Sequence, residues 1–340
     1  MMVHFGEYLK DYLEYYNISQ SEFASRLGVT QKHMNEIING KTSITLEMAA
    51  TIERLTGISS KLIVSIENAN IIQNKLLKQY GSEDKIKKML KEKYHLNELK
   101  KLKWVDFKDE TNTIQNSIDI LDFLKVKDFE INNCLMENVL FKKSGEDSNK
   151  LALWIAHCDK ISENQHVGEY TSSKFDDLIY ELKKYSYNDG LNIDKIQEIL
   201  NKYGIIFVCE KALSGTKVRG CFRVKLNTPA IYITKNYSAK DSFYFELFHE
   251  LGHCKSDYNR AKSKTIIDGD DKIEQRADEF AIKTMVNDEV WDIIIKNTNI
   301  ENLLSVSKRY KIPMSFIVGR LAKVGKISYK GRLYNEYKEK

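Results

Sequence analysis

The 340-residue sequence is poor in the residues that most often interrupt regular structure, with 2 prolines and 16 glycines. These counts exclude a collagen-like or low-complexity chain. The chain has 5 cysteines, an odd number without a C-x-x-C pair: Cys134, Cys158, Cys209, Cys221 and Cys254. We therefore expect no disulfide framework, and a reducing cytoplasm fits this cysteine usage.

Long apolar runs are also missing. No stretch approaches about 18 consecutive apolar residues, the length that a membrane span requires. Glu7 and Asp11 stand where a signal peptide would be apolar. We therefore expect a cytoplasmic protein with no membrane partner. The net charge of +5, from 53 basic and 48 acidic residues, is too small to indicate nucleic-acid binding by itself.

The length and the 42% hydrophobic content support a sizeable core and two or three domains. Abundant Lys, Glu, Leu and Ile favour helices, and a few β-branched runs near residues 205–234 favour strands. We expect a mainly α protein with a small β-sheet, an α+β fold. Its predicted divisions are residues 1–66, a helical middle region at 67–188 with no recognisable motif, and residues 189–340.

The most informative chemical pattern is an H-E-x-x-H motif within residues 248–253. On a helix, His249 and His253 lie on one face, so both imidazoles can bind one ion. Zinc takes such ligands at about 2.0–2.2 Å. Glu250 lies beside that face and could accept a proton from a metal-activated water. Two surface histidines are the alternative, but the chain has only 7 histidines and the flanking residues are apolar.

A second predicted helix, at 272–285, supplies a candidate third ligand. Its apolar residues repeat at helical spacing: Ile273, Ala277, Phe280 and Ala281. Glu274 and Asp278 lie four residues apart on the neighbouring face. We predict Glu274 as the third ligand and Asp278 as the acceptor for the second ring N–H of a ligand histidine.

The order of helix, small sheet and motif helices resembles the zinc peptidases of the thermolysin-like group. It is most similar to the ImmA/IrrE family, through residues 248–253 (FHELGH) and 274–281 (EQRADEFA). The resemblance covers about residues 190–325. One departure is that 285–288 (MVND) stands where the family usually has a proline, which affects only a helix terminus.

This resemblance implies a Zn²⁺-dependent endopeptidase. By it, His249, His253 and Glu274 bind zinc, Glu250 is the general base, and Asp278 supports the site. Relatives cut a repressor protein under stress. The expected substrate is therefore a repressor, a toxin–antitoxin partner, or the chain's own linker.

Two features of such an enzyme stay open in the sequence. The strand predicted at 230–234 could hold an extended substrate by edge addition. A donor for the developing oxyanion is also expected. The candidates are Tyr232, Tyr258, Arg219 and His166.

The alternative function is a zinc domain that senses or binds a partner without turnover. It would be closed to water by a fourth protein ligand. The nearest candidates are Cys254, Asp257, Asp268, Asp270 and Asp271.

Capping signals mark two short helices at the N-terminal end of the chain. Ser19, followed by Glu22, forms a capping box, and Gly28 ends the helix that Ser19 begins. Thr30 caps a second helix over 31–39. Two short helices joined by a tight glycine-containing turn predict a helix-turn-helix.

This segment resembles the Xre/Cro-type helix-turn-helix family through 18–24 (ISQSEFA) and 37–41 (IINGK). Within that family it is most similar to HigA-type antitoxins, through 44–49 (ITLEMA) and 55–59 (LTGIS). The resemblance implies that helix 31–39 lies in the major groove of operator DNA. It points to six DNA-contacting residues: Gln20, Thr30, Gln31, Lys32, Asn35 and Lys41.

The charge of this segment is unfavourable for DNA binding. Residues 1–65 carry six basic and seven acidic side chains, a net charge of −1, although phosphate neutralisation supplies much of the affinity of DNA-binding proteins. A homodimer on a palindromic operator would double the contacts. Apolar residues at heptad-like spacing in 66–100 could pair in such a dimer or pack on their own chain. A head that only docks to a protein is a further alternative.

Overall fold

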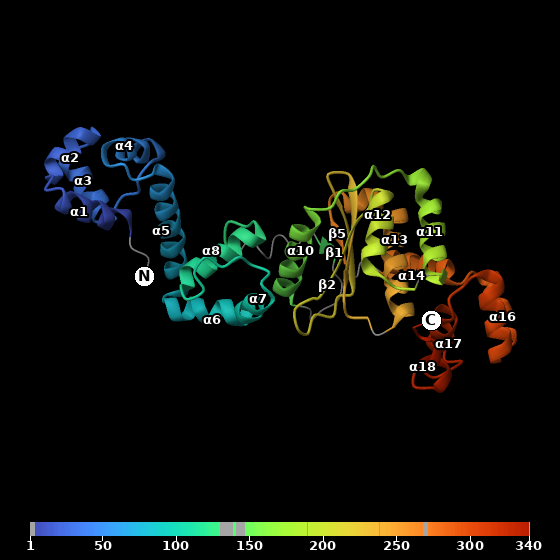
Figure 1. The fold of residues 1–340 in the computed structure, drawn as a ribbon. Helices are drawn as coiled ribbons and strands as arrows, with labels where there is room; N and C mark the ends of the chain where they lie inside the picture. The colour runs from blue at the N-terminus through green and yellow to red at the C-terminus, as the bar shows by residue number, and fades with distance from the viewer. Residues whose placement is uncertain are drawn as a thin grey trace. The chain divides into compact units, whose positions relative to one another are not determined.

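The computed structural model describes residues 4–129, 139–140, 147–188, 190–237, 239–267 and 271–339. The chain forms two compact units, residues 1–127 and 128–340. The boundary between the units falls within the middle region that was expected at 67–188. Figure 1 shows the helices of the first unit in blue to blue-green and those of the second unit in green to red.

The first unit begins with four short helices, α1 (Phe5–Tyr15), α2 (Gln20–Leu27), α3 (Gln31–Ile38) and α4 (Leu46–Thr56). The predicted caps are confirmed, because Ser19 Oγ accepts from the Glu22 N–H and Thr30 Oγ1 accepts from the His33 N–H. Gly28 ends α2 with a φ of 75°, a backbone conformation that favours glycine. Buried residues of all four helices form one core.

Four further helices complete the first unit: α5 (Ser60–Tyr80), α6 (Glu83–Lys93), α7 (Leu96–Leu102) and α8 (Thr113–Leu124). Helix α5 contacts α4 at one end and α6 and α8 at the other. Trp104, which follows α7, is buried.

The second unit is built on a mixed five-stranded sheet of order β1-β5-β3-β4-β2. The strands are β1 (Val139–Leu140), β2 (Ile206–Glu210), β3 (Gly220–Lys225), β4 (Thr228–Thr234) and β5 (Thr265–Ile266). β2 runs parallel to β4, β3 is antiparallel to both β4 and β5, and β1 runs parallel to β5. The two-residue strands β1 and β5 were not predicted, because two residues carry no readable periodicity.

The second unit also contains a series of helices, some of which pack on this sheet. In sequence order they are α10 (Ser148–Ser162), the short 3₁₀ helix η1 (Ser172–Lys174), α11 (Phe175–Asn188), α12 (Ile193–Lys202), α13 (Lys240–Ala261), α14 (Asp271–Met285), α15 (Asp288–Lys296), α16 (Ile300–Tyr310), α17 (Met314–Lys323) and α18 (Arg332–Tyr337). Figure 1 shows α10 on one side of the sheet and α12 and α13 on the other.

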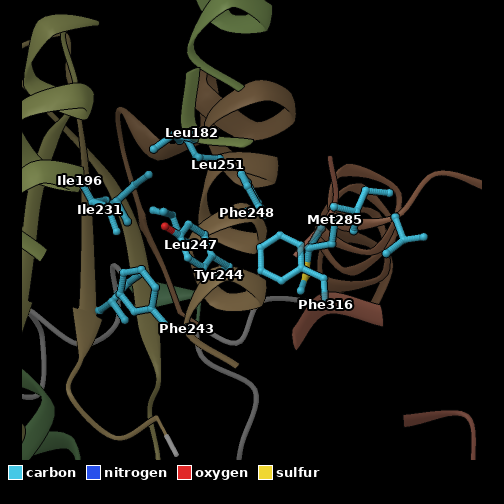
Figure 2. Packing of buried hydrophobic residues seen from close by; sticks show 14 of the residues in the cluster. Leu182, Ile196, Ile231, Phe243, Tyr244, Leu247, Phe248, Leu251, Met285 and Phe316 are labelled. Atoms are coloured by element: carbon cyan, nitrogen blue, oxygen red, sulfur yellow. The ribbon is translucent and has the colours of Figure 1, made fainter. Parts of the chain in front are cut away.

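Side chains of β4 alternate between the two faces. Ile231 and Ile233 join the core around α13, whereas the Tyr232 hydroxyl donates to Asp159 of α10 at 2.6 Å. Figure 2 shows α13 lying between Ile231 of the sheet and Phe316 of α17. Apolar residues therefore pack against several sides of α13, and this packing fixes the position of the helix that carries the motif.

The predicted fold class is confirmed, since the described chain is mainly helical with a small sheet. Among the described helices, none has the length and apolar character needed to cross a membrane.

Candidate metal centre

The central part of α13 is buried although it carries three ionisable side chains. His249, Glu250 and His253 are 9%, 3% and 1% exposed. Polar groups are costly to bury without partners. Their placement therefore requires compensating contacts, which come mainly from α14.

A close crossing of α13 and α14 brings the carboxylate helix to the histidines. Gly252 lies against the backbone of Ala277, where an added Cβ would stand 3.0 Å from the Ala277 Cα and 3.3 Å from its carbonyl oxygen. Glu274 lies one turn before Ala277 on α14. A small residue at 252 therefore sets how closely Glu274 can approach.

Three potential ligand atoms converge between the two helices. His249 Nε2 and His253 Nε2 are 3.1 Å apart, and the carboxylate of Glu274 lies 3.2 Å from the first and 3.4 Å from the second. Tetrahedral ligands at zinc bond lengths would be about 3.3 Å apart. Among the described residues, these three side chains form the group that could hold a metal ion. The donor set and its spacing therefore fit the metal that the sequence predicts.

Each histidine uses its other ring nitrogen to contact a carboxylate. His249 Nδ1 lies 2.8 Å from Asp278 Oδ1, and His253 Nδ1 lies 3.2 Å from Asp257 Oδ2. An N–H donated from Nδ1 leaves the Nε2 lone pair free for an ion. A supporting role was expected for Asp278, whereas the contact of Asp257 with His253 was not expected. The four-residue spacing of 249, 253 and 257 on one helix face was the available signal.

The ionisation of these groups reflects their mutual contacts. Burial lowers the pKa of His249, but hydrogen bonds with Asp278 and Glu274 outweigh it and raise the pKa to about 11. Burial also lowers the pKa of His253, but Asp257 and Glu274 raise it to about 9. Burial raises the pKa of Glu274, yet the two histidines hold it well below its usual value. The surrounding carboxylates thus favour a positive charge on the two imidazoles. A metal ion would displace the added imidazole protons, because it binds the neutral ring.

Glu250 occupies a tight, buried position beside the ligand set. Burial raises the pKa of Glu250 to about 8, against the opposing effect of His253 and His249. A Cβ added at Gly220, the first residue of β3, would overlap Glu250 Oε1 and lie 2.8 Å from Glu246 Oε1. Within the described residues, Glu250 Oε2 has no hydrogen-bond partner. The sequence showed no sign that Gly220 provides this space.

The candidates for an oxyanion donor lie in different surroundings. The hydroxyl of Tyr232 is on the α10 side of the sheet, away from α13. Tyr258 donates to the carbonyl oxygen of Asn227 at 2.6 Å. His166 lies in the segment between α10 and η1. Arg219 precedes Gly220 and lines a small cavity with Glu246, which lies one turn before Glu250 on α13.

The expectation that residues 230–234 hold a substrate by edge addition is wrong. β4 pairs with β2 on one side and with β3 on the other. An internal strand has no free backbone groups to offer to a peptide.

The candidate fourth ligands do not complete the described ligand set. Cys254 is buried and its thiol lies 3.6 Å from the Tyr170 hydroxyl. Asp257 contacts Nδ1 of His253, on the far side of that ring from Nε2. Asp268 and Asp270 lie outside the described residues, as does the side chain of Asp271. Among the described residues the group therefore has three members, as a catalytic zinc site requires.

The six candidate DNA-contacting residues lie on or beside the helix-turn-helix. The exposed ones are Thr30, Gln31, Lys32, Asn35 and Lys41, and Gln20 is partly buried at the start of α2. The Thr30 hydroxyl is used as the cap of α3, and Asn35 Oδ1 accepts from Asn39 at 2.9 Å.

Comparison with known families gives one match in each of the two units. A helix-turn-helix family model matches residues 9–63. A peptidase family model described as the IrrE N-terminal-like domain matches residues 201–322, the part that contains the converging side chains. No curated protein matches the chain with significance. The chain thus combines a segment similar to helix-turn-helix domains, which indicates a DNA-binding regulator, with a segment similar to the IrrE N-terminal-like domain, which indicates a metallopeptidase-like domain.

Proposed function

We propose that the protein is a DNA-binding regulator whose second unit is a zinc endopeptidase. The observation that carries this proposal is the convergence of His249, His253 and Glu274 beside the buried carboxylate of Glu250. We further propose that its substrate is a repressor, a toxin–antitoxin partner or the chain itself.

In this proposal the two histidines and Glu274 hold the ion, and each protein group has one task. Zinc bound there supplies a Lewis acid that polarises a peptide carbonyl and acidifies a water molecule. Asp278 keeps the imidazole of His249 in the tautomer that presents Nε2.

Glu250 is the proposed general base. Its Oε2, buried and without a hydrogen-bond partner among the described residues, can accept the proton of the attacking water. Glu250 can then pass that proton to the leaving amine, so that one amide and one water give one acid and one amine. Burial raises the pKa of Glu250, so its ionised carboxylate is a stronger base than an exposed one, and a cation held by the neighbouring ligands would favour that ionised form.

For the first unit we propose recognition of operator DNA by α3, with Gln31, Lys32 and Asn35 toward bases or phosphates. Lys41 and Gln20 would contact phosphates. A homodimer would double these contacts and so compensate for the unfavourable net charge of −1 of residues 1–65. We propose a phage or toxin–antitoxin setting, which the resemblance to ImmA/IrrE peptidases fused to Xre-type heads implies.

The experiment that tests the peptidase is a comparison of Glu250→Gln with the wild type. Substrate candidates are proteins that remain bound to the zinc-loaded Glu250→Gln protein, identified by mass spectrometry. The wild type should cut such a protein, whereas Glu250→Gln should bind zinc equally and fail to cut it. If Glu250→Gln cuts the substrate at the wild-type rate, Glu250 is not the general base. Zinc and partner binding without cutting by the wild type would support the alternative of a sensing module.

A further inference from the structure

Asp257 is a buried carboxylate whose two oxygens have different partners. It lies one turn after His253 on α13 and is 6% exposed. Its Oδ2 is 3.2 Å from His253 Nδ1, and its Oδ1 accepts from the Arg276 guanidinium at 2.8 Å. A buried carboxylate is tolerated when its lone pairs are used in this way.

Arg276 connects this carboxylate to the helix that carries the third ligand. It lies two residues after Glu274 on α14, so one short stretch supplies both Glu274 to the ligand set and a guanidinium to Asp257. The chain of contacts runs from Arg276 through Asp257 to the ring of His253. The orientation of His253 is therefore tied to the position of α14.

The two carboxylates that support the ligand histidines are not equivalent. The Asp278 side chain is 52% exposed, and that of Asp257 is 5% exposed. Water can replace a lost acceptor at an exposed position more easily than at a buried one. His253 therefore depends on its carboxylate more strongly than His249 does.

We infer that Asp257 and Arg276 are positioning residues that aim the Nε2 of His253 at the metal ion. This inference rests on the metal site of the proposed function. Asp257 fixes the imidazole tautomer and ring angle, and Arg276 fixes Asp257. The competing explanation is a purely structural ion pair between α13 and α14, which would affect the stability of the metal-free protein but not its zinc affinity.

The test is the zinc dissociation constant of the full chain, measured by competition with a chelating dye, beside the thermal unfolding of the metal-free protein. Removing a partner of this kind typically weakens metal binding about 10- to 100-fold. We expect Asp257→Ala to show such a loss. Asp257→Asn retains an acceptor oxygen and should stay within about threefold of the wild type. Glu279→Ala, which removes an exposed carboxylate of α14, is the matched control.

Cobalt absorption adds a readout that an ion pair between helices would not change. Co²⁺ added to Asp257→Ala should give an altered d–d spectrum, because the ring of His253 is no longer fixed. Wild-type zinc affinity and an unchanged cobalt spectrum in Asp257→Ala would overturn the inference.

Arg276→Ala keeps the inference testable if Asp257→Ala does not fold. It should weaken zinc binding less than Asp257→Ala but measurably, and wild-type affinity would exclude Arg276 from a positioning role. Failure of the wild type itself to bind zinc would instead contradict the proposed function, so the two failures are distinguishable.

Discussion

The close crossing of α13 and α14 at Gly252 predicts that Gly252→Ala weakens metal binding without unfolding the protein. A methyl group at this position would stand 3.0 Å from the Ala277 Cα, whereas carbon atoms prefer separations of about 3.5–4.0 Å. The helices must then separate by roughly 0.5 Å. Zinc bond lengths tolerate only about 0.2 Å. The displacement of Glu274 from the two histidines therefore exceeds what the ion accepts.

The size of the effect follows from two opposed terms. Alanine in a helix interior is about 1 kcal/mol more favourable than glycine, which offsets much of the cost of the close contact. We therefore expect the stability of the metal-free protein to change by less than about 1 kcal/mol, while zinc affinity falls about tenfold, equivalent to about 1.4 kcal/mol.

The assay is competition with a chelating dye, combined with urea unfolding of the metal-free protein. Ser256→Ala, an exposed position on the same helix, raises helix propensity without the close contact and serves as the control. Wild-type zinc affinity in a folded Gly252→Ala protein would refute the reasoning that helix spacing sets the ligand geometry.

Three further predictions concern other parts of the chain. Gly220→Ala should push the Glu250 carboxylate aside by about 1 Å and slow hydrolysis about 100-fold, with zinc content unchanged; cleavage at the wild-type rate would contradict this. Burial raises the pKa of Asp241 to about 6, so the folded state binds more protons than the unfolded state between about pH 4 and 6, and stability falls as the pH rises through that range. Asp241→Asn should remove about 2 kcal/mol of this fall in urea unfolding at pH 4.5 and 7.5; identical pH profiles would be evidence against it. Lys32→Ala should weaken binding to a mixed-sequence DNA duplex and lower the salt slope by about 1 in fluorescence anisotropy, whereas an unchanged slope would remove Lys32 from the phosphate contacts.

Much of the local structure could be predicted because it depends on residues near one another in the sequence. The caps at Ser19 and Thr30 and the left-handed glycine at 28 are features of single turns, and all three are present. The spacing of residues 249, 253, 274 and 278 placed two pairs of side chains on two helix faces. These patterns are readable because a helix has a fixed period.

Other features depend on tertiary contacts that no local pattern encodes. The position of β4 inside the sheet follows from its pairing with β2 and β3, and a five-residue apolar run does not reveal whether a strand is internal. The same pairing turned Tyr232 toward α10. Gly220 and Gly252 provide space for residues from distant elements, and their importance appears only when those elements are packed together.

The measurement that tests the central claim most directly is the metal content of the purified full chain by elemental analysis, with His253→Ala and Glu274→Ala beside the wild type. We predict about one zinc ion per wild-type chain and its loss in both variants. A folded wild type that takes up no zinc when it is supplied, or variants that keep it, would contradict the site formed by His249, His253 and Glu274.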